Sequence, residues 1–363
     1  MFPEKDIDGL MKGAVSGNVF PGGVLLVSVD GAIVFFEAYG VENLYSGKPV
    51  TKETVFDLAS LTKPLATTFA VMKLIQRSHL ALNQNLGSIL PSFKNTDKEK
   101  IRIEQLLYHN SGLPDYRPYY KLVRNLEPGQ RKDVLRELLV KEPLAHPPGR
   151  QVVYSDLGFM VLCWAVETAS GTRLDHFVME TIYRPLNLKT LFFMPIDKDP
   201  PRFSFAATER CPWRGIVLEG IVHDDNAYSA GGIEGHAGLF GTAEDVFCLL
   251  SELSACYRGE SSKKIFDSKL TRHFLRRNKH TGRALGFDTP SLTDPSCGRF
   301  FSEKTVGHLG FTGTSFWMDL GRNMMVILFT NRIHPSRDNN RIKAFRPILH
   351  DAVMENFIIG KST

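Results

Sequence analysis

The sequence lacks the features of a membrane-spanning or nucleic-acid-binding protein. No apolar stretch reaches the roughly 20 residues that a membrane-spanning helix needs. The opening residues 1–6 carry acidic groups and lack the apolar segment of a secretion signal. Lysine and arginine form no basic block, and the formal net charge of +5 is small for 363 residues. We therefore expect neither a membrane nor a nucleic acid as partner.

The cysteines form no disulfide or metal framework. The five of them include no C-x-x-C pair and stand at Cys163, Cys211, Cys248, Cys256 and Cys297. An odd number of cysteines without metal-ligand spacing is typical of reduced thiols in a cytosol. The sequence therefore predicts a soluble cytoplasmic protein without metal or cofactor. An exported protein stays open as the alternative, if a leader segment has been removed.

Strand patterns occur near both ends of the chain. Residues 22–29 and 32–39 are apolar runs joined by Asp30-Gly31, a pair that supplies the positive φ of a tight hairpin turn. Residues 314–319 and 324–330 form a second pair, and helical periodicity dominates the middle. This order predicts an α+β fold: one antiparallel sheet built from both termini and flanked by helices, plus a mostly helical domain.

The same pattern predicts two domains. We place an α/β sheet domain at residues 1–70 and 237–363, and a mostly helical domain at 71–236. An active cleft is expected between the two, since ligand sites commonly lie at such boundaries. Loops 115–130 and 286–305 would shape that cleft and set its specificity.

A Ser-x-x-Lys tetrad opens a long apolar helix. If the helix begins near Ser60, Ser60 and Lys63 share one face, and Pro64 fits its first turn because a backbone donor is not needed there. A serine so placed is a candidate nucleophile, and the free N–H groups of the helix start can stabilise an oxyanion. The tetrad alone is weak evidence for a nucleophile, because Ser261 and Lys264 have the same Ser-x-x-Lys spacing within a polar stretch.

Two further polar segments stand at structurally defined places. Tyr154-Ser155-Asp156 precedes an apolar helix, residues 157–170, that Gly171 closes. His308-Leu309-Gly310 lies on an expected strand, where Gly310 would let a substrate approach the backbone closely. Both segments are therefore candidate partners for Ser60 and Lys63.

In this order the three segments resemble the serine β-lactamase and penicillin-binding-protein superfamily. The family pattern is S-x-x-K, then Y-x-N, then K-T-G or H-x-G, and the similarity is greatest to its class C-like branch of β-lactamases, D-alanyl peptidases and esterases. The resemblance runs from about residue 20 to 335. It includes three supporting segments, at Leu106–Pro114, Pro148-Gly149 and Gly238–Asp245. It implies a β-lactamase/transpeptidase-like fold.

The resemblance also implies the roles of individual residues. Ser60 would be the acylated nucleophile, and Lys63 and Tyr154 would share the proton transfers. The oxyanion would be bound by the backbone N–H groups of Ser60 and Phe311, the residue after His308-Leu309-Gly310. No metal or cofactor takes part in this chemistry.

Asp156 departs from the family pattern, which has an asparagine at that position. A carboxylate cannot donate to a substrate amide, and beside Lys63 it would hold the lysine protonated. We expect this to shift the general-base role toward Tyr154 and to weaken recognition of acylamino side chains. In an alternative alignment, Ser155-Asp156 corresponds to the S-D-N of class A enzymes, and Ser155 carries the proton relay.

His308 is the second departure, because it stands in place of lysine. A histidine is charged only part of the time, which predicts weaker binding of β-lactams and D-Ala-terminated peptides and leaves room for neutral esters. The alternative is a hydrogen-bonded strand histidine without a binding role. His109 is expected to be structural.

A histidine-rich loop region raises the possibility of a metal site. Residues 223–226 read His-Asp-Asp-Asn, and His236 follows in a glycine-dense loop. Their spacing does not match a helical histidine pair, so hydrogen bonds that brace the rim of the cleft are favoured over a metal site.

The sequence thus predicts a serine hydrolase that forms an acyl-enzyme on a small ester, amide or peptide substrate. A β-lactamase-like esterase or amidase is favoured. A D-alanyl-D-alanine carboxypeptidase or a β-lactamase is the alternative, and a carboxypeptidase gains weight if the chain is exported. A function of another class also stays open: a penicillin-binding sensor or scaffold that does not hydrolyse its ligand.

Overall fold

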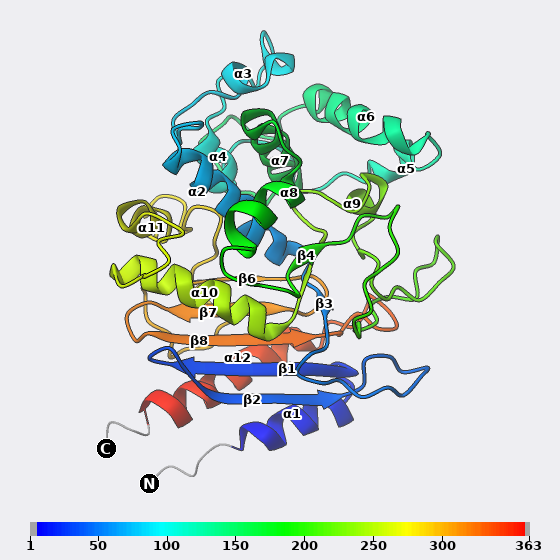
Figure 1. Ribbon diagram of the computed structural model, residues 1–363, viewed down its shortest axis with the longest axis vertical. Coiled ribbons are helices and arrows are strands. Elements are labelled where there is room, and N and C mark those ends of the chain that lie inside the picture. The colour runs from blue at the N-terminus through cyan, green and yellow to red at the C-terminus, as the bar shows by residue number, and fades with distance from the viewer. Residues whose placement is uncertain (1–5, 360–363) are drawn as a thin grey trace.

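A five-stranded antiparallel sheet forms the centre of the computed structural model, which describes residues 6–359 (Figure 1). The strand order is β2-β1-β8-β7-β6, so two N-terminal strands pair with three from the C-terminal part. The bounds are β1 Gly22–Val29, β2 Ala32–Gly40, β6 Thr305–Leu309, β7 Ser315–Asp319 and β8 Met324–Thr330. The expected fold class, with one sheet built from both ends of the chain, is confirmed.

The β1–β2 hairpin forms where the sequence predicts it. Asp30 and Gly31 have φ values of 52° and 80°, the positive values that a tight hairpin turn requires. β1 pairs with β2 on one side and with β8 on the other, and it is buried along almost its whole length. Its nearly continuous run of apolar residues follows from this central position.

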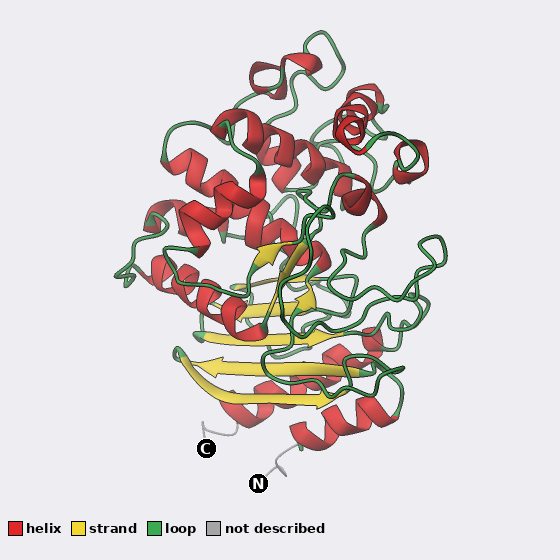
Figure 2. Cartoon of the chain, turned by 45° about the vertical axis from the view of Figure 1, so that its right-hand side comes forward, coloured by secondary structure: helices red, strands yellow, loops and turns green. Residues whose placement is uncertain are grey.

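Helices cover both faces of the sheet (Figure 2). α1 (Ile7–Ser16) and α12 (Ile342–Met354) pack on one face, and α10 (Ala243–Arg258) packs on the other. Thr242 caps α10 by accepting a hydrogen bond from the Asp245 N–H. The two ends of the described chain therefore meet on one side of the sheet.

A second, mostly helical layer lies over the α10 face (Figure 1). At its base is a small sheet that the sequence did not predict, with strands β3 Phe56–Asp57, β5 Leu239–Gly241 and β4 Phe192–Phe193 in that order. The other α-helices are α2 Phe69–Gln76, α3 Leu86–Ile89, α4 Ile103–Leu107, α5 Tyr120–Val123, α6 Pro128–Lys141, α7 Asp156–Ser170, α8 Leu174–Val178, α9 Asp225–Ser229 and α11 Ser268–Phe274. Short turns of other helix types lie at Pro91–Phe93, Met179–Tyr183 and Glu355–Ile359.

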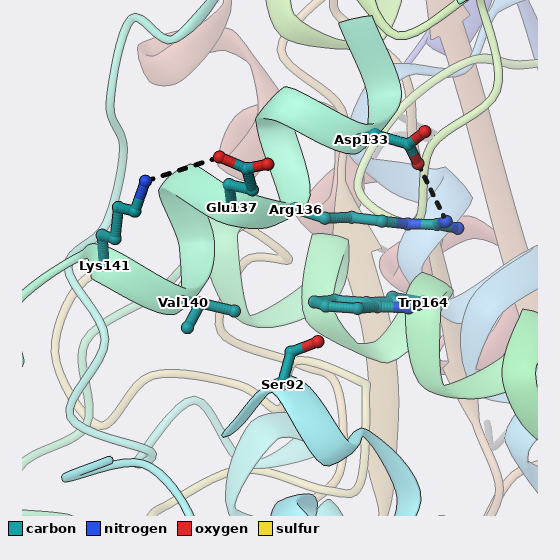
Figure 3. Close-up of a pocket in the computed structure, with 7 residues that line it drawn as sticks. All are labelled: Ser92, Asp133, Arg136, Glu137, Val140, Lys141 and Trp164. Carbon is teal, nitrogen blue, oxygen red and sulfur yellow. Dashed lines mark hydrogen bonds and ion pairs between the residues drawn. The ribbon is translucent and has the colours of Figure 1, made fainter. Parts of the chain in front are cut away.

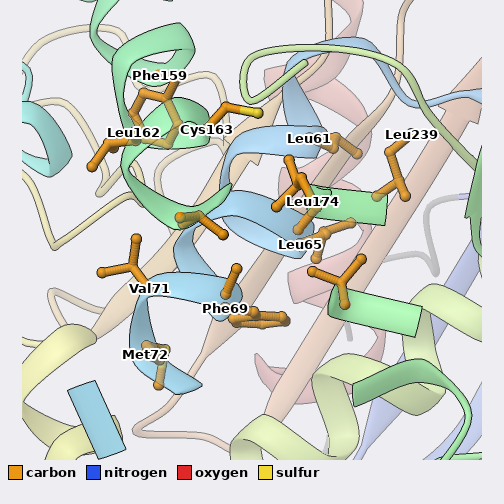
Figure 4. Packing of buried hydrophobic residues seen from close by; sticks show 14 of the residues in the cluster. Leu61, Leu65, Phe69, Val71, Met72, Phe159, Leu162, Cys163, Leu174 and Leu239 are labelled. Atoms are coloured by element: carbon orange, nitrogen blue, oxygen red, sulfur yellow. The ribbon is translucent and has the colours of Figure 1, made fainter. Parts of the chain in front are cut away.

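A continuous helical segment carries the Ser60 tetrad through the core. It begins as a 3₁₀ turn at Ala59–Leu61, continues as a π-helical stretch at Lys63–Thr68 and ends as α2. Figure 4 shows side chains of this segment in one buried cluster with α7 and β5, among them Leu61, Leu65, Phe69, Phe159, Leu162 and Leu239. Because the segment is packed on all sides, its N-terminal end is held in a fixed place.

The structure does not test the expectations about the N-terminal segment and the division into domains. Residues 1–5 and 360–363 fall outside the described part of the chain, and most of the N-terminal segment used to judge a secretion signal is among them. Within residues 6–359, no helix is both long enough and apolar enough to cross a membrane. The division into domains at residues 1–70 with 237–363 and 71–236 stays a prediction.

Phe69 provides a test of this core. Its side chain is fully buried, and its ring centroid lies 5.0 Å from that of Phe266 and 6.2 Å from that of Phe287. We expect Phe69→Ala to lower the free energy of unfolding by about 3–5 kcal/mol, because it leaves a cavity. Leu122→Ala, at a side chain 63% exposed, should change it by less than about 0.5 kcal/mol. Urea unfolding of both variants measures the difference, and equal effects would contradict the packing described.

Candidate active site

Ser60 stands at the start of the buried helical segment. The first helical backbone bond runs from Leu61 N–H to Leu58 O, and the Ala59 N–H is capped by Asp57 Oδ1, whereas the Ser60 N–H makes no hydrogen bond within residues 6–359. Lys63, three residues on, places its Nζ 3.1 Å from Ser60 Oγ. The structure therefore brings together the hydroxyl and the amine of the tetrad, as the spacing predicts.

Lys63 is completely buried and holds several groups around its ammonium. Its Nζ donates to Asp156 Oδ1 at 2.6 Å and lies 3.3 Å from the carbonyl oxygen of His236. Burial lowers the pKa of Lys63, but the charges of Asp156 and of the Tyr154 hydroxyl, together with hydrogen bonds to both, outweigh it and raise the pKa above its usual value. The lysine is therefore an ammonium ion at neutral pH, as expected for a lysine beside Asp156.

Tyr154 is the third group at this point. Its ring centroid lies 4.7 Å from Lys63 Nζ. Although 36% of the residue is exposed, its hydroxyl lies close enough to Lys63 and Ser60 to share hydrogen bonds with both side chains. Burial raises the pKa of Tyr154, the charge of Lys63 lowers it, and Asp156 raises it again, so that it is above its usual value overall. Tyr154 is therefore a neutral phenol at rest.

His109 supports the loop that carries Tyr154. Its Nδ1 accepts a hydrogen bond from Ser155 N–H at 3.0 Å, its carbonyl oxygen accepts from Val153 N–H at 2.8 Å, and its ring lies 4.6 Å from the Tyr154 ring. Burial lowers the pKa of His109 well below its usual value, so the ring is neutral. This matches the structural role expected of His109.

Ser155 is turned away from the site, and the alternative in which it relays protons is wrong. Its hydroxyl donates to Pro114 O at 2.5 Å and accepts from Gly158 N–H at 3.0 Å, as the N-cap of α7. Alternating side-chain directions in the extended loop explain the difference, because Tyr154 and Asp156 face Lys63 while Ser155 faces the core.

His308 lies close to Tyr154, with 5.8 Å between ring centroids. Burial lowers the pKa of His308 to about 4, so the ring is neutral at pH 7 and the expectation that it is charged part of the time is wrong. Its Nδ1 lies 2.9 Å from Leu309 O and so carries the proton. Its buried Nε2 has no hydrogen-bond partner among the described residues.

The turn after His308 is tied to the backbone just ahead of Ser60. The hydroxyl of Thr312 donates to Asp57 O at 2.7 Å, and that of Thr314 donates to Leu58 O at 3.2 Å. These two bonds bring the turn that contains Phe311 beside the helix start that contains Ser60.

The two bonds also explain Gly310. A Cβ at this position would lie 2.0 Å from Thr314 Oγ1 and 2.8 Å from Leu58 O, so the chain itself requires the glycine. The approach of a substrate, expected from the sequence, is not needed to account for it.

The orientation of the Gly310–Phe311 peptide follows from its neighbours. Gly310 O accepts from Gly313 N–H at 3.1 Å, and the N–H of a trans peptide points opposite to its carbonyl. The Phe311 N–H makes no hydrogen bond among residues 6–359. Two unpaired backbone donors, those of Ser60 and Phe311, thus lie on adjoining segments.

The histidines of the glycine-dense region are paired with carboxylates. His223 Nε2 lies 3.0 Å from Glu209 Oε2, and His236 Nε2 lies 2.9 Å from Asp224 Oδ1. In the described part of the chain, no three His, Cys, Asp or Glu side chains are grouped so as to hold a metal ion. His236 serves the site through its backbone, since its carbonyl oxygen faces Lys63.

Two residues near the site escaped the sequence analysis. Arg283 and Asp288 form an ion pair, and the Arg283 guanidinium lies 5.7 Å from the centre of the Tyr154 ring. The backbone of Asp288 pairs with Gly307, next to His308. The only sequence signal was their position: Asp288 lies within loop 286–305, which was expected to set substrate specificity, and Arg283 lies just before it.

A hollow of about 380 Å³ in the helical layer contains none of the predicted site residues (Figure 3). Charged side chains of α6 line it: Asp133, Arg136, Glu137 and Lys141, beside Trp164 of α7. They pair with one another, as Figure 3 shows, or with Glu167.

Comparison with known proteins decides the family. The family model described as Beta-lactamase matches residues 7–347, nearly the whole chain. The chain belongs to the beta-lactamase family. As a member of this family it is a serine hydrolase related to the penicillin-binding proteins, as the order of the motifs predicts.

Two relatives in the beta-lactamase family align along most of the chain. An N-acetylmuramyl-L-alanine amidase of Bacillus subtilis (strain 168) is 34% identical over 87% of this chain and 78% of its own length. A putative D-alanyl-D-alanine carboxypeptidase of Salmonella agona (strain SL483) is 32% identical over 93% of this chain and 84% of its own length.

Solved structures share the beta-lactamase family fold. EstCE1, a hydrolase with promiscuous acyltransferase activity, superposes with a TM-score of 0.73 at 22% identity, over 93% of this chain and 97% of its own. An octameric penicillin-binding protein homologue from Pyrococcus abyssi gives a TM-score of 0.71 at 18% identity, over 94% and 76%. At these identities the likeness shows the fold alone.

Asp156→Asn tests the electrostatics of this site. The substitution removes a negative charge that raises the pKa of both Lys63 and Tyr154, so both values should fall. If either group must lose a proton for reaction, the rising limb of the kcat/KM–pH profile should move to lower pH by about one unit or more. Asp133→Asn, at a side chain 77% exposed on α6, is the control and should leave the limb in place. An unchanged limb in Asp156→Asn would refute the coupling.

Proposed function

We propose that this chain hydrolyses ester or amide carbonyls through an acyl-enzyme formed on Ser60. The observation that carries the proposal is the 3.1 Å contact of Lys63 Nζ with Ser60 Oγ, at a helix start with a free N–H. Ser60 Oγ would attack the substrate carbonyl, and the N–H groups of Ser60 and Phe311 would bind the oxyanion. Asp156, His308 and Gly310 would complete the binding surface around them.

Tyr154 is the proton carrier in this proposal. Asp156 keeps Lys63 charged, so the ammonium stabilises a phenolate at Tyr154 rather than accepting the Ser60 proton itself. Because Tyr154 is a neutral phenol at rest, it first loses its proton to solvent. The phenolate then takes the Ser60 proton as Ser60 attacks, and the phenol so formed gives that proton to the departing oxygen or nitrogen. Water then repeats the sequence in reverse and releases the acid. The raised pKa of Tyr154 predicts activity that rises with pH through the neutral range.

One departure from the family pattern, His308 in place of lysine, narrows the substrate class. Because His308 is neutral, it offers no positive charge to a substrate carboxylate. This disfavours an efficient β-lactamase. Both aligned relatives are named for amide-bond hydrolysis. A small amide, peptide or ester is therefore the proposed substrate. A D-alanyl-D-alanine carboxypeptidase is the second candidate, supported by the name of the Salmonella relative.

The cysteines support a proposal about the compartment in which the protein works. All five cysteines are free thiols, which favours a reducing compartment such as the cytoplasm.

A sensor or scaffold that binds without turnover is the candidate of another class. The assembled Ser60, Lys63 and Tyr154 argue against it, because a protein that only binds has no need of a proton carrier.

Intact-mass spectrometry tests the function. The protein is incubated with an ester, a peptide and a β-lactam, and we expect an adduct of the acyl mass with turnover of at least one substrate. Ser60→Ala should abolish the adduct and lower kcat by at least about 10³-fold.

Ser261→Ala is the matched control, because Ser261 belongs to the other Ser-x-x-Lys match and hydrogen-bonds Glu252. It should retain both adduct and turnover. An adduct that persists in Ser60→Ala would contradict the proposal, and a stable adduct without turnover would favour the sensor.

A further inference from the structure

The turn between β6 and β7 is held by a buried arginine. Arg332 lies just after β8, and its Nε and Nη2 atoms both donate to the carbonyl oxygen of Phe311, at 2.9 and 2.5 Å. A third nitrogen, Nη1, donates to the backbone oxygen of Asn339. A Cβ on Gly313, in the middle of the turn, would lie 2.6 Å from Arg332 Cγ. The turn therefore packs against the stem of Arg332, and the guanidinium holds one of its carbonyls.

The carbonyl that Arg332 holds belongs to the residue whose N–H has no partner. Within the turn, the Gly310 N–H donates to Thr314 O at 2.7 Å, and Gly310 O accepts from the Gly313 N–H at 3.1 Å. Arg332 satisfies the carbonyl of Phe311, whereas the Phe311 N–H makes no hydrogen bond within residues 6–359. The peptide groups on both sides of Phe311 are thus fixed, and its N–H is left for a ligand.

The Phe311 side chain is held by the same arginine. Its ring centroid lies 4.7 Å from the central carbon of the Arg332 guanidinium and 5.6 Å from the centroid of the His223 ring, to which it is nearly parallel. His223 is buried and lies 3.0 Å from Glu209 Oε2, which fixes its ring. Phe311 itself is exposed, and an exposed turn residue without such contacts would be mobile. Arg332 therefore restrains both the backbone and the ring of Phe311.

Arg332 also carries a positive charge without a negative partner. Its hydrogen bonds within residues 6–359 go to backbone oxygens and to the Asn340 side chain, and none goes to a carboxylate. Burial lowers the pKa of Arg332 from its usual value of 12.5, but an arginine keeps its proton at neutral pH. A buried cation without a counter-ion is costly for folding. Such a charge is expected where a reaction develops negative charge close by.

We propose that Arg332 is a positioning residue for the oxyanion hole, because it fixes Phe311 so that the Phe311 N–H is aimed at the reacting carbonyl oxygen before a substrate binds. The inference rests on the proposed function and deepens it, since it names the group that preorganises one of the two donors. The carbonyl oxygen gains negative charge only as Ser60 Oγ bonds to the carbonyl carbon, so the donor acts mainly in the transition state. Loss of Arg332 should therefore lower kcat and leave KM nearly unchanged.

Two esters that differ in one atom test this role. The probes are 4-nitrophenyl acetate and its thiono analogue, in which sulfur replaces the carbonyl oxygen, and nitrophenolate release reports turnover of both. Each kcat/KM is divided by the rate constant for hydroxide-catalysed hydrolysis of the same ester. Sulfur is larger than oxygen and a weaker hydrogen-bond acceptor, so the unaltered protein should favour the oxygen ester by at least about tenfold.

Arg332→Lys keeps the charge but cannot make both hydrogen bonds to the Phe311 carbonyl in the same geometry. It should lower kcat for the oxygen ester by about 10- to 100-fold, with KM nearly unchanged, and lower the oxygen-to-sulfur ratio by at least about threefold. Arg332→Gln should show the same two changes, and serves alone if the lysine variant does not fold. Urea unfolding checks that each variant is folded.

Arg131→Gln is the control, because the Nε of Arg131 also donates to a backbone carbonyl, that of Leu126 at 2.9 Å, but does so on α6. It should keep both kcat and the ratio. A lower kcat with an unchanged ratio in the Arg332 variants would leave Arg332 a structural role and overturn the inference. A kcat within about twofold of the unaltered protein, or a ratio near one in the unaltered protein, would overturn it as well. Absence of turnover of the oxygen ester by the unaltered protein would instead contradict the proposed function.

Discussion

A buried ammonium ion organises the candidate site. Lys63 is fully removed from solvent, and an unpaired charge at such a place would cost several kcal/mol. Four groups compensate for that cost: the Asp156 carboxylate, the Ser60 hydroxyl, the His236 carbonyl and the Tyr154 phenol with its ring. These groups come from two separate stretches of the chain besides the helix of Lys63 itself. The need to satisfy one cation therefore brings together residues that are remote in sequence.

The fold holds the other half of the site by a different means. The turn that follows β6 reaches the helix start through the hydroxyls of Thr312 and Thr314, which bond the carbonyls of Asp57 and Leu58. These hydrogen bonds are neutral and buried, so they fix geometry without adding charge beside Ser60. The sheet thus supplies the Phe311 N–H, the central helix supplies Ser60 and Lys63, and the helical layer supplies Tyr154 and Asp156. Each of these three parts of the fold therefore contributes groups to the candidate site that the other two do not provide.

Much of this arrangement could be predicted from the sequence, where local chemistry decides it. The Asp30-Gly31 turn, the closure of α7 at Gly171 and the start of α10 at Thr242 follow from backbone preferences, and the family motifs gave the order of the site residues. Features that depend on long-range packing were missed. The strands of the small sheet are two or three residues long, too short to show a period. The Arg283–Asp288 pair and the neutrality of His308 depend on which loops cover them. The direction of Ser155 depended on how the loop meets His109 and Pro114.

The charge state of Lys63 is the point on which the account depends, because it decides whether the lysine or the tyrosine carries the proton. It can be measured directly by ¹⁵N NMR of the Nζ resonance in protein labelled at lysine, with Lys63→Arg to assign the signal. We expect Lys63 to stay an ammonium ion through neutral pH and to titrate above its usual pKa of 10.5. A pKa of Lys63 below 7 would show that the Asp156 carboxylate does not hold the proton on the lysine, and would contradict the account.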